Sequence, residues 1–229
     1  MKRNIILIFG AHPDDIEIGM GGFIADNKDS EIIMCDLTLG EMGSNGNIEI
    51  REKEALKSQS VLNVKERINL SMADRNIIVD KKNIEIVSNV IRKYKPKIVF
   101  APYPKDYHPD HENCSKLVRE AIHLSGLIKF KSNYEKHRPD SFIYYYINDI
   151  ENQNFYYNIS EVIEKKIEAL SCHESQFGND GKSVKTYLNN DFIDKIVTRD
   201  KYYGNKCGVN YCETFHKVGA ILVNNIWEI

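Results

Sequence analysis

Two short clusters of histidine and aspartate stand out in this 229-residue chain, because both could bind a metal ion or move protons. The first is His-Pro-Asp-Asp, from His12 to Asp15, and the second is His-Pro-Asp-His, from His108 to His111. Imidazole nitrogen and carboxylate oxygen are ligands of zinc, and a catalytic zinc site takes three protein ligands and a water. Two clusters of this kind on neighbouring loops would supply such a set.

Each cluster alone also has a purely structural explanation. Loops rich in Asp and Pro are often turns, and Asp14 or Asp15 could cap a helix by accepting from its free backbone N–H groups. The glycine-rich run 19–22 could indicate a dinucleotide-binding turn, but two carboxylates precede it where a pyrophosphate would need N–H donors. A close contact between a helix and the sheet explains these glycines better. The presence of both clusters in one chain favours a metal site.

The two clusters follow predicted strands of an α/β pattern. Apolar runs and Tyr/Phe-rich runs predict strands at 4–9, 31–37, 68–70, 97–101 and 141–147. Apolar residues at helical spacing predict helices at 17–27, 49–62, 84–94, 114–125 and 159–170. The alternation predicts a mainly parallel sheet in one domain, residues 1–229, with extra helices and a terminal strand or two in the last third. Ligands bind beyond the carboxyl ends of such strands, where both clusters lie.

Composition excludes several other classes of protein. A formal net charge of −2 gives no reason to expect a nucleic-acid partner. Polar residues interrupt every apolar stretch before it reaches the ~18 residues of a membrane span, so we expect a cytoplasmic protein with no membrane partner. The five cysteines are an odd number without a C-x-x-C pair, which argues against a disulfide framework. Cys207 and Cys212 remain open as metal ligands.

At this point the residues resemble a known family, the LmbE-like (PIG-L) zinc-dependent N-acetylglucosamine deacetylases. The resemblance rests on His-Pro-Asp-Asp-Ile-Glu-Ile-Gly at 12–19 with two further glycines, and on the second cluster at 108–111. Residues 38–55 fit the same family. The C-terminal stretches 199–204 and 208–215 look like the branch that acts in bacillithiol synthesis.

The resemblance implies a Rossmann-like α/β fold, a Zn²⁺ cofactor and a division of roles within the two clusters. Asp14 would be the general base, and His108 would stabilise an oxyanion or protonate the leaving amine, with Asp110 orienting its ring. Bound zinc lowers the pKa of water and polarises an amide carbonyl. The metal ligands implied are His12, Asp15 and His111.

The resemblance also implies a substrate, the acetamide of an N-acetylglucosaminyl conjugate, with N-acetylglucosaminyl malate as the leading example. Arg51 and Arg138 would bind the hydroxyls or the acidic aglycone of this small sugar conjugate. His173 is interpreted as structural, and stretches 125–136 and 175–188 as shaping the aglycone side of the pocket. Two alternatives stay open: a deacetylase of chitin-derived sugars or an antibiotic glycoside, and a non-catalytic, metal-stabilised sugar- or nucleotide-binding protein. Family members form trimers or hexamers, so we expect a homo-oligomer.

Overall fold

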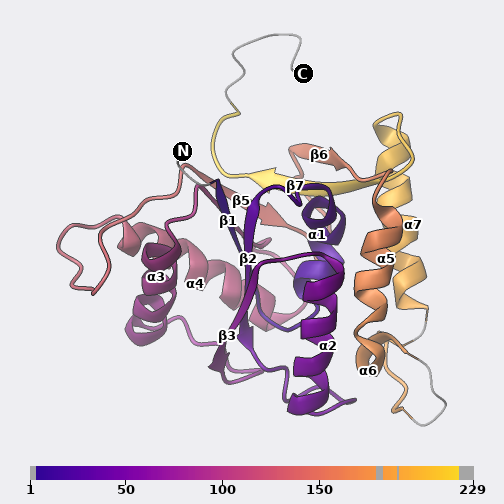
Figure 1. The fold of residues 1–229 in the computed structure, drawn as a ribbon, viewed down its shortest axis with the longest axis horizontal. Coiled ribbons are helices and arrows are strands. Elements are labelled where there is room, and N and C mark those ends of the chain that lie inside the picture. The colour runs from indigo at the N-terminus through magenta and orange to yellow at the C-terminus, as the bar shows by residue number, and fades with distance from the viewer. Residues whose placement is uncertain (1–3, 179–182, 190, 222–229) are drawn as a thin grey trace.

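A seven-stranded sheet forms the centre of the molecule (Figure 1), which is a computed structural model describing residues 4–178, 183–189 and 191–221. The strand order is β3-β2-β1-β4-β5-β7-β6, and the first five strands in this order run parallel. The strands are β1 (Ile5–Gly10), β2 (Glu31–Thr38), β3 (Glu66–Met72), β4 (Ile98–Pro102), β5 (Ser141–Tyr145), β6 (Phe155–Asn158) and β7 (Cys212–Lys217). The mainly parallel α/β fold predicted from the sequence is confirmed.

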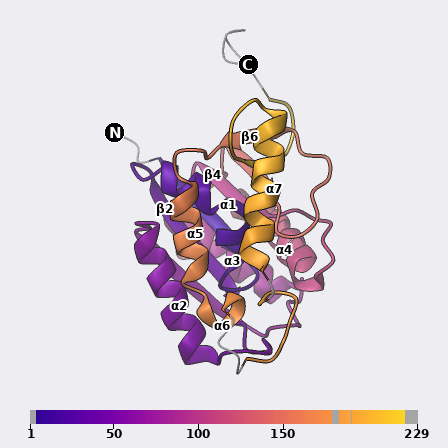
Figure 2. The same ribbon diagram turned by 90° about the vertical axis from the view of Figure 1, so that its right-hand side faces the viewer.

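Helices cover both faces of this sheet (Figures 1 and 2). Two of them pack on one face, α3 (Lys81–Tyr94) and α4 (Pro109–Ser125). The other face carries α1 (Asp15–Asp26), α2 (Ile48–Val61), α5 (Ile163–Ser171), α6 (Glu174–Phe177) and α7 (Phe192–Lys206). Successive side chains of a strand point to opposite faces. In β1, accordingly, Ile6 and Ile8 join the core under α1 and α5, whereas Leu7 and Phe9 join the core under α3 and α4.

The last two strands depart from the parallel pattern. β7 lies between β5 and β6 and pairs antiparallel with both, so it runs opposite to its two neighbours in the sheet. β6 was not predicted, and the helix expected from residue 159 begins four residues later, at Ile163. The reason is that Ile159 extends the strand pairing instead, donating its N–H to the carbonyl of Tyr211 at 3.0 Å.

The glycines of α1 permit a close approach of helix and sheet, as predicted. A Cβ at Gly19 would lie 2.2 Å from Cδ2 of Tyr145 on β5, and one at Gly22 would lie 2.7 Å from Ile159. This contact holds the amino end of α1, and the first polar cluster with it, against the carboxyl end of the sheet.

The helical hydrogen bonding of α1 is interrupted in its middle, and a residue of β7 supplies the missing acceptor. The backbone leaves helical geometry at Met20 (φ −153°), so the N–H groups that follow lose their helical partners. The buried carboxylate of Glu213 on β7 accepts from the N–H groups of Gly22 and Phe23, at 2.8 and 2.7 Å. Its Oε1 lies 2.7 Å from Nζ of the fully buried Lys166, an ammonium that it shares with Asp200 at 2.6 Å.

Among the described residues, no helix is both long enough and apolar enough to cross a bilayer.

Candidate metal centre and active site

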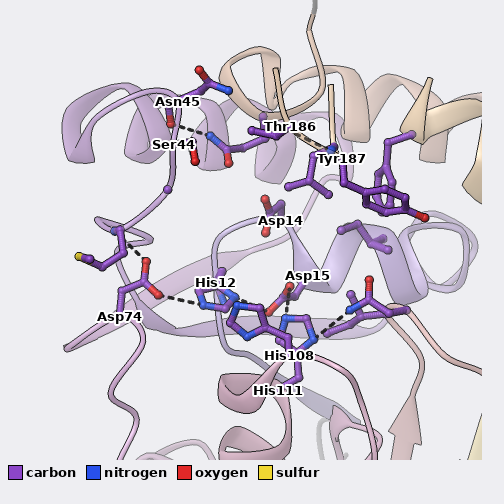
Figure 3. A pocket seen from close by; sticks show the side chains of 18 of the residues that line it. His12, Asp14, Asp15, Ser44, Asn45, Asp74, His108, His111, Thr186 and Tyr187 are labelled. Atoms are coloured by element: carbon purple, nitrogen blue, oxygen red, sulfur yellow. Dashed lines mark hydrogen bonds and ion pairs between the residues drawn. The ribbon is translucent and has the colours of Figure 1, made fainter. Parts of the chain in front are cut away.

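The two polar clusters meet at one edge of the sheet because β1 and β4 are adjacent parallel strands. The first cluster follows Gly10 at the end of β1, and the second opens α4 a few residues after β4. The ring of His12 lies 4.8 Å from that of His108 and 5.4 Å from that of His111, between centroids. One ligand atom from each of these three rings falls within 4.8 Å of the others (Figure 3). The donor set is therefore rich in nitrogen, which fits zinc.

Asp15 lies between two of these rings with one oxygen toward each. Its Oδ1 is 3.2 Å from Nε2 of His111, and its Oδ2 is 3.4 Å from Nδ1 of His12. The carboxylate is held in place because Oδ2 also accepts from the backbone N–H of His12 at 2.8 Å. Asp15 thus lies between His12 and His111. In the described part of the chain, the groups whose ligand atoms lie within 4.8 Å of one another are His12 with His108 and His111, and His12 with Asp74 and Asp110, so the ligand set His12, Asp15 and His111 stays a prediction.

The far nitrogen of each of these two rings contacts a second carboxylate. Nε2 of His12 lies 3.1 Å from Asp74 and 3.5 Å from Asp110, and Nδ1 of His111 lies 3.0 Å from Asp106. Outer carboxylates of this kind fix the tautomer and orientation of histidines that bind metals. His108 contacts no such carboxylate in the described part of the chain. Its Nε2 instead lies 3.2 Å from Nη1 of Arg75, which distinguishes it from His12 and His111.

Asp106 and Asp74 were not predicted as site residues from the sequence. Asp106 accepts from the N–H of His108 at 2.8 Å and contacts Nδ1 of His111 at 3.0 Å, so it holds both ends of the second cluster. It also accepts from Nδ2 of Asn148 at 2.8 Å. Asp74 follows β3, and its Oδ2 accepts from the N–H of Met42 at 2.9 Å. The fold brings Asp74 to the first cluster and Asp106 to the second. Of the two, only Asp106 had a signal in the sequence, because it precedes His108 by two residues.

The ionisable groups of the cluster strongly shift one another's pKa values. Burial alone would lower the pKa of the His111 imidazole, but Asp15 and Asp106 outweigh it and raise the pKa to about 9. His12 behaves alike: burial opposes its charge, yet Asp15, Asp110 and Asp74 raise its pKa well above the ordinary value. In turn, the two rings hold the pKa of Asp15 well below its usual range against the effect of burial. A cation that binds here must therefore displace protons.

His108 differs from its neighbours in charge as well as in contacts. Burial, together with the positive charges of His111 and His12, lowers the pKa of its imidazole to about 4. Its ring caps α4, with Nδ1 accepting from the N–H of Asp110 at 3.2 Å. Asp110 was expected to orient this ring through its carboxylate and to favour its protonated form. The structure corrects the orientation: the backbone N–H of Asp110 holds the ring, while its carboxylate accepts from the N–H of Arg75 at 2.6 Å and faces His12. The charge of that carboxylate does raise the pKa of His108, but burial and the two other rings outweigh it.

Asp14 occupies the cap position of α1 without capping it through its side chain. Its Oδ2 instead lies 3.1 Å from Nη2 of the buried Arg51, whose Nη1 donates to the carbonyl of Gly40 at 2.7 Å. Nε of Arg51 is buried and has no hydrogen-bond partner among the described residues. The carboxylate of Asp14 is thus presented to the cavity, not used to stabilise the helix.

These groups line a cavity of about 290 Å³. Asp14, Asp15, Arg51 and the three histidines all border it, and the segment 186–188 forms the opposite wall (Figure 3). That segment belongs to the stretch 175–188 expected to shape the pocket, whereas no residue of 125–136 borders it. Arg138 was expected to bind substrate but is exposed just before β5, at the amino ends of the parallel strands, so this chain does not bring it to the cavity.

The remaining candidates lie away from the cavity. Cys207 and Cys212 are not among the residues that could hold a metal ion in the described part of the chain. His173 is fully buried, with Nε2 3.2 Å from Glu17, beneath α1. This position is consistent with its predicted structural role.

Comparison with known proteins agrees with this geometry. Residues 7–122 match the family described as GlcNAc-PI de-N-acetylase, PIG-L. The chain belongs to this family. Both polar clusters of the PIG-L chain fall inside the matched residues, whereas the wall at 186–188 falls outside them.

Individual relatives of this PIG-L chain divide by substrate. The diacetylchitobiose deacetylase of Thermococcus kodakarensis is 30% identical, over 96% of this chain and 85% of that protein. A probable N-acetyl-alpha-D-glucosaminyl L-malate deacetylase 2 of Bacillus anthracis is 26% identical, over 80% of this chain and 86% of that protein. The structure of N,N'-diacetylchitobiose deacetylase from Pyrococcus horikoshii with its inhibitor MPG superposes with a TM-score of 0.84 at 28% identity, covering 95% of this chain and 84% of that one.

Proposed function

We propose that this PIG-L protein hydrolyses the acetamide of an N-acetylglucosamine-containing sugar to acetate and a free amine, with zinc held by His12, Asp15 and His111. The observation that carries the proposal is the division among the three rings. His12 and His111 each turn one nitrogen to Asp15 and the other to an outer carboxylate, as metal ligands do. Among the described residues, His108 has neither of these two contacts. A zinc ion bound there would activate water and polarise the acetamide carbonyl.

The chain's own residues supply the proton transfers and the electrostatic stabilisation. Asp14, held by Arg51 and lining the cavity, accepts the proton of the attacking water and passes it to the nitrogen of the leaving amine as the C–N bond breaks. His108 is neutral at neutral pH because its pKa is about 4. In this structure Nδ1 accepts from the N–H of Asp110 and Nε2 lies 3.2 Å from Nη1 of Arg75, so the neutral ring donates to the developing oxyanion through an Nε2 proton only when the substrate displaces that guanidinium. This protonation state favours the oxyanion role of His108 over that of a general acid.

Two sugars are candidates for the natural substrate, and they differ in the group attached to N-acetylglucosamine. The match to diacetylchitobiose deacetylases covers nearly the whole chain, and it supports a short N-acetylglucosamine oligosaccharide as the first candidate. N-acetylglucosaminyl malate, the leading substrate predicted from the sequence, is the second candidate and is supported by the weaker match to the Bacillus anthracis protein. Arg51, which lines the first cavity beside Asp14, is the residue expected to bind a sugar hydroxyl next to the acetamide.

The experiment is acetate release by zinc-loaded protein from diacetylchitobiose, N-acetylglucosaminyl malate and N-acetylglucosamine, each with a chelator-treated control. Release that stops on chelation and returns with zinc supports the proposal. Stoichiometric zinc binding without release from any of the three sugars would refute the deacetylase and favour the non-catalytic alternative.

The homo-oligomer, a trimer or hexamer, and the cytoplasmic location stay predictions. Light scattering coupled to size-exclusion chromatography measures the oligomeric state directly.

A further inference from the structure

Two cysteines flank the short turn that joins α7 to β7. Cys207 ends α7, and Cys212 is the first residue of β7. Both are free thiols, and the thiol of Cys212 donates a hydrogen bond to the sulfur of Cys207. In the described part of the chain neither belongs to a group that could hold a metal ion, and neither borders the cavity beside the histidines. Their contact therefore needs an explanation outside the proposed reaction.

The turn holds the two cysteines in fixed positions. The carbonyl of Gly204 accepts from the N–H of Cys207 at 2.9 Å and from that of Val209 at 3.0 Å. The backbone of Gly204 also packs directly on the turn, since a Cβ there would lie 2.5 Å from the amide nitrogen of Tyr211. The N–H of Tyr211 in turn donates to Oγ of Ser160 at 3.1 Å. A disulfide forms without strain only where the backbone already brings the two side chains together, and this turn does so.

The two thiols differ in their access to solvent. Cys207 is exposed, whereas Cys212 is only 2% exposed. Burial, the charge of a Cys207 thiolate and the hydrogen bond between the two side chains raise the pKa of Cys212 to about 12. Because the thiolate is the reactive form of cysteine, an oxidant in solution reacts with Cys207 first. Once the sulfur of Cys207 is bonded it carries no negative charge, so one cause that keeps the proton on Cys212 is removed.

We propose that Cys207 and Cys212 form an intramolecular disulfide when the protein meets a thiol oxidant of the low-molecular-weight disulfide class. The Cys207 thiolate attacks one sulfur of the oxidant, forms a mixed disulfide and expels the other half as a thiolate, which takes up the proton that Cys207 lost. Cys212 then loses its proton and attacks the sulfur of Cys207, which breaks the mixed disulfide and releases the second half as a thiol. Two protein thiols are oxidised by two electrons, and one disulfide is reduced to two thiols.

The disulfide ties α7 to the part of β7 that supports α1. Cys212 directly precedes Glu213, whose carboxylate accepts from two N–H groups of α1. The ammonium of Lys166 joins this carboxylate to Asp200 of α7, at 2.7 and 2.6 Å. A cross-link raises stability mainly by restricting the unfolded chain, and the loop closed here is short. For a protein of this size, we expect the oxidised form to unfold about 4–8 °C higher than the reduced form.

The test treats reduced, full-length protein with oxidised glutathione and then blocks the remaining thiols with iodoacetamide in denaturant. Trypsin cleaves after Lys206 and Lys217, so both cysteines stay in the peptide 207–217. We expect mass spectrometry to find this peptide unblocked and lighter by two hydrogen atoms than its reduced form. Cys172 is the internal control: it is partly exposed, but its thiol donates to the carbonyl of Glu168 at 3.4 Å, so it should be recovered blocked.

Single substitutions separate the two steps. Cys212→Ser should retain glutathione on Cys207 as a stable mixed disulfide, whereas Cys207→Ser should leave the buried Cys212 unmodified. A wild-type protein that keeps glutathione on Cys207 beside a blocked Cys212, or that forms the bond between two chains, would overturn the proposal.

Thermal unfolding of chelator-treated protein tests the structural consequence. The melting temperature of wild type should rise by about 4–8 °C on oxidation, and that of Cys207→Ser should not change. A melting temperature that is unchanged or lower in wild type with the bond formed would mean that the disulfide distorts the turn, contrary to the proposal.

Discussion

Replacing Asp106 by alanine should weaken zinc binding without touching any proposed ligand. Asp106 contacts Nδ1 of His111 at 3.0 Å, and loss of an outer partner of this kind typically costs about 10- to 100-fold in metal affinity. The same carboxylate raises the pKa of His111, so its removal also reduces the competition from protons. The two effects oppose each other at pH 7, where wild-type His111 is protonated in the absence of metal. Above pH 9 that competition ends, and we expect the full loss there.

Competition with a chromophoric chelator at pH 7 and pH 9.5 measures both effects. The loss for Asp106→Ala should be larger at the higher pH, and Asp106→Asn, which keeps an acceptor oxygen, should lose less. Lys105→Ala is the control, since Lys105 is adjacent in sequence but pairs at the surface with Glu151. A zinc dissociation constant within twofold of wild type for Asp106→Ala at both pH values would refute the assignment of His111 as a zinc ligand that Asp106 holds in place.

Three further predictions concern the same region. Asp14→Asn should keep stoichiometric zinc while acetate release falls by roughly 10²–10⁴-fold, and near-wild-type turnover would exclude Asp14 as the base. The pKa of His111 is raised in the folded protein, so its contribution to stability is complete below its unfolded pKa of about 6.5 and is lost as pH rises to about 9. Denaturant unfolding of chelator-treated protein should therefore show a loss on the order of 3 kcal/mol between pH 6 and pH 9, and an increase would contradict the ion pairing with Asp15. Gly19→Ala should lower the free energy of unfolding by about 1–3 kcal/mol, because its Cβ would overlap Tyr145, whereas Gly126→Ala, whose Cβ would have ordinary contacts, should change it little.

The sequence predicted the elements whose signal is local. Buried parallel strands such as β1 and β4 are continuous apolar runs, and the polar clusters at their ends follow directly along the chain. β3 was predicted only as residues 68–70, because Glu66 and Arg67 interrupt its apolar pattern. In the fold, Arg67 is buried against Glu17 and Asp36 at 2.6 and 2.7 Å, so a charged residue occupies a strand position through partners that no local pattern reveals.

The candidate ligands could be read from short motifs, whereas most of the residues that contact them could not. His12, Asp15 and His111 belong to short motifs, but Asp74 is brought to His12 by the loop after β3, across 62 positions of the sequence. The sequence could not show whether Asp110 would use its carboxylate or its backbone toward His108, since that depends on where α4 begins. No pattern around Arg138 in the sequence indicates at which end of the sheet this residue lies.

The link between Glu213 and the broken helix α1 has a consequence for how the protein is made. The N–H groups of Gly22 and Phe23 are buried, and their acceptor lies about 190 positions later, on β7. During synthesis on the ribosome, the first helix emerges long before the strand that completes it, and burying two unpaired donors costs about 1–3 kcal/mol each. The second half of α1 is therefore expected to settle against the sheet only when nearly the whole chain has been translated. Contacts of such long range also slow folding. His12 lies in the loop directly before this helix and Asp15 is the first residue of the helix, so the capacity to bind metal should arise late, as one of the last steps in the maturation of a nascent chain.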